Sequence, residues 1–471
     1  MDASHDSAGE AEESTISDGD LDDEPLPPWV ASARAASSRE AREVPTLQTI
    51  VCHVLAEHLH CLESLEYLPD HLASIVRGAV QRDRRLLSDD SLAVWLESAS
   101  RGGTATKLDL RWASSISDQG MNVIAAADPS WTHSIVELDL SFCEALTDAG
   151  VQAFAPSVPS LRALVLSGCV KCGDGACKAI GHHCSLLERC ELELLQRTTD
   201  LGVQALVRGC PGLSDLRLGG CAKLSNISTS LIADHCTGTM CRLGLGGLST
   251  LNDVDLEDVG KITSLTWLDL CACPKVSDAG IKQVGLLAAK QMKAHALWEE
   301  KWGGGGGGGV HANDASPSAA ESASAGTAST AAPVRSGVGS GTSAARCLRS
   351  VSSSDVGALG TGTSTSSSRP PPPPTIRHLD LGGLARLSDT GLQKLLQRTK
   401  HLTSLDLRGC SRLTEDGLAT ALASCDGNGA RVAGVQLVPM LERLTLLALD
   451  AASERVVTRI ESARPGLKLV R

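Results

Sequence analysis

Two leucines separated by a single residue recur at a nearly fixed interval along the chain. The recurring segments begin at Leu138, Leu164, Cys190, Leu216, Leu243 and Leu268. The first four are 26 residues apart. A fixed period of this length is typical of a solenoid, in which one repeat cannot bury its own apolar face and stacks on its neighbours. The pattern therefore predicts a repeat array.

The order of apolar and polar positions inside one repeat predicts its elements. In LDLSFCEALTDAGVQAFA the two leucines of LDL point into one core, and the residue between them faces outward, as in a short strand. Thr147 and Asp148 suit a helix N-cap and first turn, and Val151 and Phe154 give the buried side of that helix. Each unit is strand, turn and helix. Stacked units make an α/β horseshoe with a parallel sheet on the concave face and helices outside.

These residues resemble the cysteine-containing leucine-rich repeats. The family pattern LxxLxLxxCxxLTDxGL is matched closely at Leu138 to Val151, Leu268 to Ile281 and Leu405 to Leu418. The resemblance implies a leucine-rich-repeat solenoid with an N-terminal helical module. It implies little about function, because such a solenoid presents whatever surface is built on it.

Composition and charge narrow the classes of partner. The net charge is −12, which argues against direct binding of nucleic acid. The sequence shows no secretory signal and no apolar run long enough to cross a membrane, so we expect no membrane partner and a reducing compartment, the cytoplasm or the nucleus.

The seventeen cysteines mostly occupy repeated positions, which favours small buried side chains over disulfides or metal ligands. The stretch from Cys169 to Cys184 is dense in Cys and His, but it holds one CxxC pair and fits no structural zinc pattern. No metal and no cofactor are expected.

Shifts in composition divide the chain into five parts. Residues 1–44 begin with ten carboxylates before Pro25 and no Lys or Arg, which predicts a disordered acidic tail. Residues 45–100 form a helical module, 101–285 a leucine-rich-repeat solenoid, 286–375 a flexible insertion rich in Gly, Ser, Ala and Pro, and 376–471 the C-terminal part of the same solenoid.

The helical module is the most informative stretch for function. Apolar residues recur at helical spacing from Leu47 to Leu62, and a second helix starts at Pro69. The module is either a cap on the first repeat or a docking site for an adaptor protein. The candidate adaptor-binding residues are Leu47, Val51, Cys52, Leu55, Leu68, Pro69, Leu72, Ile75 and Val76.

A second resemblance favours the docking site. CHVLAEHL from Cys52, followed by the Leu68-Pro69 segment, resembles the elongin C-binding box of elongin A and of the leucine-rich-repeat subunit of the nucleotide-excision-repair ubiquitin ligase. That box has Leu four residues before a small residue. Thr46-Leu47 places Val51 at the small position, whereas Cys52 at that position places Gln48 where Leu belongs.

Leu68 to Val76 also resembles the start of an F-box, and F-box proteins commonly carry these repeats. Both resemblances imply an adaptor, Skp-type or elongin C, that bridges to a cullin.

The residues that face outward on the concave side are the candidate client-binding surface. Six of the nine positions between the paired leucines are acidic, which favours a basic client unless the carboxylates are simply solvated. The candidate client-binding residues are Asp109, Arg111, Trp112, Asp139, Phe142, Arg217, Asp269, Asp380, Asp406 and Arg408.

The sequence contains no P-loop, no GxSxG, no HExxH and no RING-type Cys/His series, so we expect a binding protein and not an enzyme. The expected function is that of a substrate receptor of a cullin-RING ubiquitin ligase, SCF-like or elongin-containing, that binds a protein client on its repeats. The alternatives are an interaction scaffold without a ubiquitin link and, more specifically, a DNA-repair ligase subunit.

Overall fold

The computed structural model describes residues 47–62, 64–101, 106–302, 370–422, 438–449, 452–463 and 466–470. The chain divides into two units, residues 1–55 and residues 56–471. The predicted acidic tail and most of the predicted insertion lie outside the described residues, as does Cys425.

The second unit contains one parallel sheet whose described strands follow the order of the chain. The strands are β1 (Lys107–Asp109), β2 (Glu137–Asp139), β3 (Ala163–Val165), β4 (Arg189–Glu191), β5 (Asp215–Arg217), β6 (Arg242–Gly244), β7 (Trp267–Asp269), β8 (His378–Asp380), β9 (Ser404–Asp406), β10 (Arg443–Thr445) and β11 (Lys468–Val470). The register aligns the central residues of neighbouring strands, so that Leu138 pairs with Leu164 and Leu164 with Cys190. The predicted leucine-rich-repeat solenoid is confirmed.

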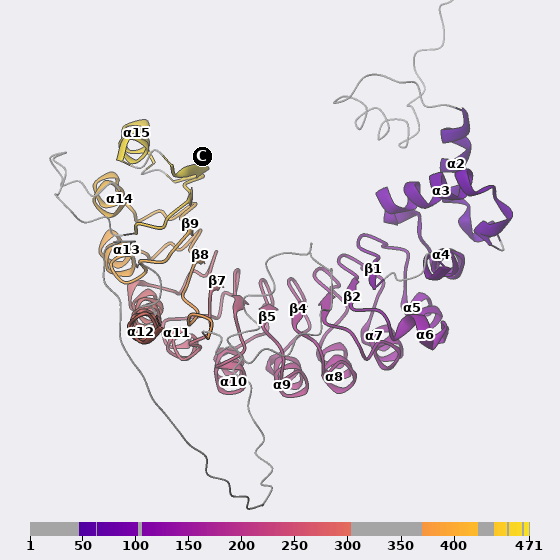
Figure 1. Cartoon of the computed structure of the whole chain (residues 1–471), viewed down its shortest axis with the longest axis horizontal. Coiled ribbons are helices and arrows are strands. Elements are labelled where there is room, and N and C mark those ends of the chain that lie inside the picture. Colours follow the sequence, from indigo (N-terminus) through magenta and orange to yellow (C-terminus); the bar gives the residue numbers. More distant parts are fainter. Residues whose placement is uncertain are drawn as a thin grey trace, which may run out of the picture. The chain divides into compact units, whose positions relative to one another are not determined.

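The helices of the repeats lie along one side of this row of strands, and the strands line the other side (Figure 1). They are α5 (Asp118–Ala126), α6 (Pro129–Thr132), α7 (Asp148–Phe154), α8 (Asp174–His183), α9 (Asp200–Gly209), α10 (Asn226–Cys236), α11 (Asp255–Val259), α12 (Asp278–Trp302), α13 (Asp389–Leu396), α14 (Glu415–Leu422) and α15 (Glu454–Ala463), with the 3₁₀ helix η4 at Ala155–Ser157. The face of the sheet opposite these helices is called the inner face below.

The N-terminal elements precede the first strand. They are α2 (Leu47–Glu57), η1 (Leu59–Cys61), η2 (Leu65–Tyr67), α3 (Asp70–Arg82), η3 (Arg84–Leu86) and α4 (Asp89–Arg101). Leu92, Trp95 and Leu96 of α4 are buried. Helices α2 and α3 lie where the sequence predicted two helices, and α4 follows them.

The repeated cysteines fill the space between adjacent repeats. Cys143, Cys169 and Cys221 are fully buried, and each thiol donates a hydrogen bond to a carbonyl of the preceding repeat at 3.3, 3.0 and 3.0 Å. The interpretation of this cysteine column as small buried side chains with a weak donor is confirmed.

A row of aspartates at or just before the starts of the helices joins most repeats to the next, with Asn226 in place of an aspartate at the start of α10. The carboxylate of Asp118 accepts hydrogen bonds from the backbone N–H of Thr147, at 2.8 Å, and from its hydroxyl, at 2.6 Å. Thr147 meanwhile caps its own helix through the N–H of Ala149. We call these residues the aspartate ladder; its members are Asp89, Asp118, Asp148, Asp174, Asp200, Asp253, Asp278 and Asp389.

The ladder begins at α4, before the first strand. Asp89 accepts hydrogen bonds from the N–H groups of Ser117 and Gly120 at 2.8 and 2.9 Å. Asp148, Asp174 and Asp253 each accept the same pair of N–H groups from the next repeat. Ser88 also forms a parallel bridge with Ser115. Helix α4 therefore occupies the position of a repeat helix and covers the first repeat.

The sheet continues across the predicted insertion, since β7 pairs directly with β8. The predicted boundary at residue 286 is too early. Helix α12 runs on to Trp302, and Leu287, Ala288 and Gln291 are buried. The side-chain amide of Gln291 donates a hydrogen bond to the carbonyl of Leu265 at 2.8 Å, and its oxygen accepts one from the N–H of Ile376 at 2.9 Å. These bonds join α12 to the segment just before β8.

Candidate protein-interaction surfaces

Helix α2 has an exposed apolar side and a buried side. Val51 and Val54 are 47% and 46% exposed, Leu55 is half-buried, and Cys52 is fully buried. The side chain of Leu47 lies outside the described residues. Cys52 has no exposed surface in this structure, and its contact with an adaptor stays a prediction. Of the two registers for the elongin box, only the one with Val51 at the small-residue position places that residue at the surface.

Helix α3 presents a second apolar side. Leu72 and Ile75, three residues apart, are half-buried, while Val76 is fully buried. Val76 therefore packs in the core in this structure, and its contact with an adaptor stays a prediction. A Cβ added at Gly78 would meet no atom within 4 Å, so this side of the helix is open.

The segment before α3 adds to the same apolar side. Tyr67 is 77% exposed and Leu68 is half-buried. Pro69 is exposed at the N-cap of α3. Tyr67 was missed by the sequence argument, although it directly precedes the Leu-Pro pair. Leu72 and Ile75 share one face of α3, since they are three residues apart, whereas Leu68 lies before the helix begins.

Ion pairs neutralise the first inner-face carboxylates. The guanidinium of Arg111 forms two-pronged hydrogen bonds with Asp109, at 2.9 to 3.2 Å, and lies 3.8 Å from Asp139. Arg84, from η3, lies 3.6 Å from the same Asp109 carboxylate. Burial raises the pKa of Asp109, but the hydrogen bonds from Arg111 and the charge of Arg84 outweigh it and leave this pKa below its usual value.

Trp112 and Phe142 form one aromatic stack beside these ion pairs. Their rings are parallel, with centroids 4.0 Å apart and an angle of 2° between the planes. Trp112 is 47% exposed, and Phe142 is half-buried. The Phe142 ring covers Gly168, where an added Cβ would lie 2.5 Å from it.

The two aromatic residues have an unusual backbone conformation, with positive φ. The positive φ occurs in the turn that follows a strand, three residues after the strand ends. Glycine occupies this position at Gly168, Gly220, Gly247, Gly383 and Gly409. Trp112 and Phe142 adopt φ of 65° and 60° at the equivalent position, as does Leu194 at 64°. A side chain there costs about 1–2 kcal/mol, because the Cβ crowds the carbonyl oxygen. Bulky side chains retained at strained positions mark a candidate functional surface.

The middle of the inner face carries arginines around one buried carboxylate. Asp215, 8% exposed, lies 3.2 Å from Arg242 and 3.7 Å from Arg217. Both guanidiniums also lie over the Trp267 ring, at 5.1 and 5.2 Å from its centre. Burial raises the pKa of Asp215 above its usual value against the pull of these arginines. Only Arg217 of this group was a candidate from sequence, because Asp215, Arg242 and Trp267 precede the paired leucines.

The last predicted carboxylates gather around Arg408. Its guanidinium lies 2.9 Å from Asp380 and 3.3 Å from Asp406. Asp269, on the neighbouring strand β7, accepts the backbone N–H of Cys271 at 2.8 Å, and burial raises its pKa. Asp269, Cys271 and Asp380 have ligand atoms within 4.8 Å of one another, but the Arg408 guanidinium already supplies the cation at this point.

The predicted client-binding residues thus form three separate groups. Asp109, Arg111, Trp112, Asp139 and Phe142 lie together, Arg217 lies apart from them, and Asp269, Asp380, Asp406 and Arg408 form the third group. Since arginines of the same face pair with most of the carboxylates, the acidic count alone overstates how negative the inner face is.

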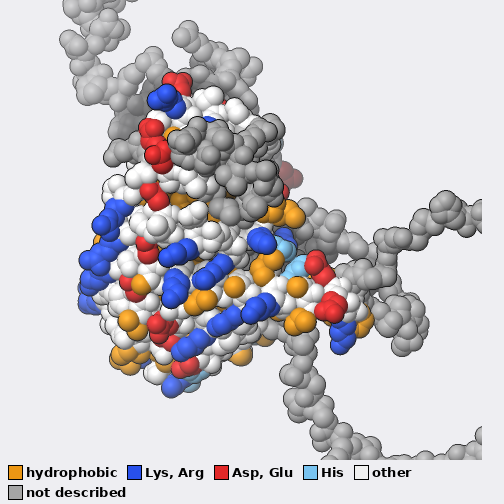
Figure 2. All heavy atoms as spheres, turned by 90° about the vertical axis from the view of Figure 1, so that its left-hand side faces the viewer, with side chains coloured by type: hydrophobic (Ala, Val, Ile, Leu, Met, Phe, Trp, Pro, Cys, Tyr) orange, Lys and Arg blue, Asp and Glu red, His pale blue; other side chains and the backbone are white. Residues whose placement is uncertain are grey.

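A row of cations at the edge of the solenoid was missed. A Lys or Arg stands two residues before the helix N-cap in most repeats, and each of these side chains is exposed. The row consists of Lys171, Arg197, Lys223, Lys275, Arg386 and Arg412. Figure 2, which views the molecule from the left-hand side of Figure 1, shows Lys and Arg side chains gathered in rows on that face. The fixed position relative to the N-cap was the sequence signal.

The cysteines of the Cys- and His-rich stretch near α8 belong to the core. Cys169, Cys172, Cys177 and Cys184 are fully buried. Burial raises the pKa of the Cys184 thiol to about 12. These thiols are packed between repeats and are not presented to a ligand.

Two segments match a family model described as leucine-rich repeat, residues 133–155 and 400–420. The chain therefore contains leucine-rich repeats, and its fold is that of a leucine-rich-repeat protein-binding scaffold. Among the helices that the structure describes, none is both long and apolar enough to cross a membrane.

Three solved structures are similar to this chain at low identity. They are the Rad7 and Elc1 complex from yeast, with 13% identity, 91% of this chain and 93% of that chain covered and a TM-score of 0.37; an internalin from Listeria monocytogenes, with 12% identity, 77% and 66% covered and a TM-score of 0.39; and the leucine-rich-repeat-containing protein LegL7 from Legionella pneumophila, with 14% identity, 77% and 88% covered and a TM-score of 0.40.

Proposed function

We propose that this chain is a substrate-recognition subunit of a cullin-RING ubiquitin ligase, acting without chemistry of its own in the cytoplasm or nucleus. In this proposal α2 and α3 bind an adaptor, elongin C or a Skp-type protein, and the repeats hold a protein client. The adaptor and its cullin would bring a charged conjugating enzyme close to client lysines, so that the assembly supplies catalysis by proximity.

The proposal rests on a difference between two N-terminal helices: α4 covers the first repeat, whereas one apolar side of α3 is left partly exposed. Helix α4 already covers the first repeat, because Asp89 takes part in the aspartate ladder and Leu92 and Leu96 are buried. A solenoid needs one such cap. The apolar side of α3, at Leu72 and Ile75, is left partly exposed, and apolar side chains that recur along one helical face suit a partner's groove.

The exposed side of α2 supports the same conclusion independently. Val51 and Val54 each keep nearly half of their surface in water, three residues apart on one helix. The elongin box places its Leu four residues before the small residue, which here are Leu47 and Val51. This register is the one that leaves the small-residue position accessible.

The client side of the proposal rests on the first two repeats. Trp112 and Phe142 place a stacked aromatic pair at strained backbone positions, next to the paired charges of Arg111 and Asp109. Aromatic and arginine side chains carry much of the binding energy at protein interfaces. We therefore expect a client with an apolar anchor here, in place of one selected by positive charge alone.

The test is reconstitution of the full chain with purified elongin C and elongin B, and separately with a Skp-type adaptor and its cullin. Gly78→Glu adds a charged side chain to the open side of α3, where nothing in the fold is displaced. Val51→Asp does the same on α2. We expect a stoichiometric complex with one adaptor and a loss of at least about tenfold in affinity, about 1.4 kcal/mol, with either variant.

The control is Ala93→Glu, which adds the same charge to an exposed position of α4. It should bind like the parent chain. If neither adaptor binds the folded parent chain, the receptor proposal fails and the protein is a scaffold without a ubiquitin link. Binding that survives both Gly78→Glu and Val51→Asp would show that the adaptor uses another surface.

A further inference from the structure

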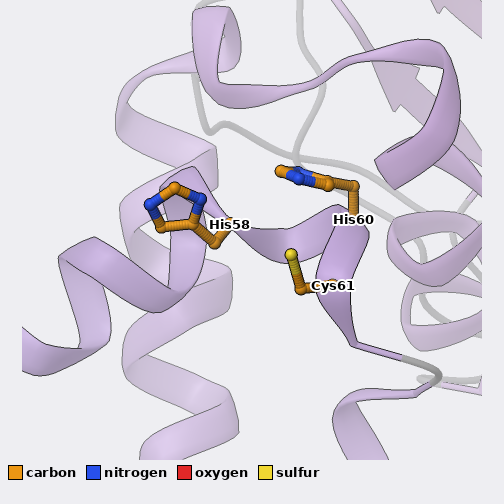
Figure 3. Close-up of side chains that lie close together, drawn as sticks. All are labelled: His58, His60 and Cys61. Carbon is orange, nitrogen blue, oxygen red and sulfur yellow. The ribbon is translucent and has the colours of Figure 1, made fainter.

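Three side chains of types that can bind a metal ion lie close together at the turn after α2. His58, His60 and Cys61 are all exposed, and their ligand atoms lie within 4.8 Å of one another. Figure 3 shows the two imidazole rings and the Cys61 sulfur gathered at this turn. The ring centres of the two histidines are 5.9 Å apart.

The backbone holds this turn in place. The N–H of Cys61 donates to the carbonyl of His58 at 2.9 Å, and the N–H of Leu62 donates to Leu59 at 3.1 Å. Leu59 itself is fully buried and anchors η1. The three side chains therefore project from a fixed turn, and only their own rotamers need to change for them to converge.

Cys61 differs from the other cysteines of the described segments. The free thiols there are buried, apart from Cys271, which is half-buried, and Cys61, which is exposed. The buried thiols fill repeat positions in the core, as the column Cys143, Cys169 and Cys221 shows. Packing does not explain Cys61, and it stands beside two histidines.

We propose that His58, His60 and Cys61 bind a zinc ion. Zinc takes imidazole nitrogen at about 2.0–2.1 Å and thiolate sulfur at about 2.3 Å in a tetrahedron, which places ligand atoms roughly 3.3–3.8 Å apart. The observed cluster needs a contraction of about 1 Å to reach that geometry, within the reach of exposed side chains. As the zinc–sulfur bond forms, the Cys61 thiol releases its proton to solvent, and each imidazole binds through a neutral ring nitrogen.

Three protein ligands leave the fourth position of the tetrahedron for water or for a group from a binding partner. The ion would tie His58 to the η1 turn and fix the direction in which the chain leaves Glu57. This inference stands apart from the proposed adaptor surface, because it concerns the turn and not the exposed sides of α2 or α3.

The experiment is titration of the full chain with zinc chloride against a chromophoric chelator, followed by titration with cobalt(II). One metal ion should bind per chain. The cobalt complex should show a thiolate-to-metal charge-transfer band in the near ultraviolet and visible bands typical of four-coordinate cobalt. Cys61→Ser should abolish the charge-transfer band, and His58→Ala or His60→Ala should each weaken zinc binding at least about tenfold.

The chain offers a matched control at the end of α8. His182 and His183 are exposed with ring centres 5.6 Å apart, next to Cys184, but that thiol is fully buried. His182→Ala/His183→Ala should leave zinc affinity unchanged. The proposal is overturned if the parent chain binds no zinc, or if His58→Ala/His60→Ala/Cys61→Ser keeps the affinity of the parent.

Discussion

The carboxylate of Asp278 accepts a hydrogen bond of 2.8 Å from the backbone N–H of Ser388, although the two residues are 110 positions apart. The Ser388 hydroxyl bonds to the same carboxylate. This is the contact that Asp118 makes with Thr147 only 29 positions away. The aspartate ladder therefore spans the insertion without a change in geometry, and it joins α12 to α13 as if they were consecutive repeats.

Removing this carboxylate should destabilise the junction between the two parts of the solenoid. Asp278→Ala leaves the N–H and the hydroxyl of Ser388 without their charged acceptor, which costs about 1–3 kcal/mol. The measurement is urea unfolding of the full chain. Asp416→Ala, at an exposed position in the first turn of α14, is the control and should shift stability by less than about 0.5 kcal/mol. Equal losses in the two variants would contradict a special role for Asp278.

Glycines next to the ladder should not tolerate a methyl group. A Cβ at Gly391 would overlap the carboxylate of Asp278, so Gly391→Ala should cost about 1–3 kcal/mol. Gly78→Ala, in the open middle of α3, should instead stabilise by about 0.4–1 kcal/mol, since alanine restricts the unfolded chain more than glycine does. Thermal unfolding of both variants gives the comparison. If the Gly391→Ala chain is as stable as the parent, the Asp278 carboxylate can move to admit the methyl group without loss of stability.

The stack of Trp112 on Phe142 should appear as a coupling free energy. In a double-mutant cycle, Trp112→Ala and Phe142→Ala should couple by about 0.5–1.5 kcal/mol in the free energy of unfolding. Trp112→Ala and Leu194→Ala, three strands apart in the sheet, should add within about 0.5 kcal/mol. Coupling of equal size in the two cycles would mean that the effect spreads through the sheet and does not belong to the ring contact.

Thiol alkylation of the native chain should separate Cys61 from the repeat cysteines. Burial raises the pKa of Cys221, Cys273 and Cys410 to about 11, so at pH 8 these thiols hold about a hundredfold less of the reactive thiolate than an ordinary cysteine. In the metal-free chain Cys61 is exposed and should react first with iodoacetamide. Raising the pH toward 11 should increase the reactive thiolate of the other three, to the extent that the fold admits the reagent.

Peptide mapping by mass spectrometry assigns each modified position in that experiment. Unfolding in urea removes burial and should bring all four cysteines to similar rates at pH 8. Labelling of Cys221 as fast as Cys61 in the native chain would contradict the packing of the cysteine column.

The repeat pattern determined the strands, the helices and their inward faces, because these depend on contacts within one repeat and between identical neighbours. The Leu138 and Leu164 register and the burial of Cys143 could be predicted in this way. The N-cap at Thr147 could too, since a capping hydroxyl bonds to the backbone two residues ahead.

Only the tertiary structure decided which side chains meet across repeats. The sequence placed Asp109 and Arg111 on one face, but it could not show that Arg111 and Arg84 together neutralise that carboxylate. It left Val51 and Cys52 as alternatives, and burial separated them. The reason is physical: periodicity fixes the face on which a residue lies, whereas the pairing of charges and the exposure of a thiol depend on how neighbouring turns of the chain pack together.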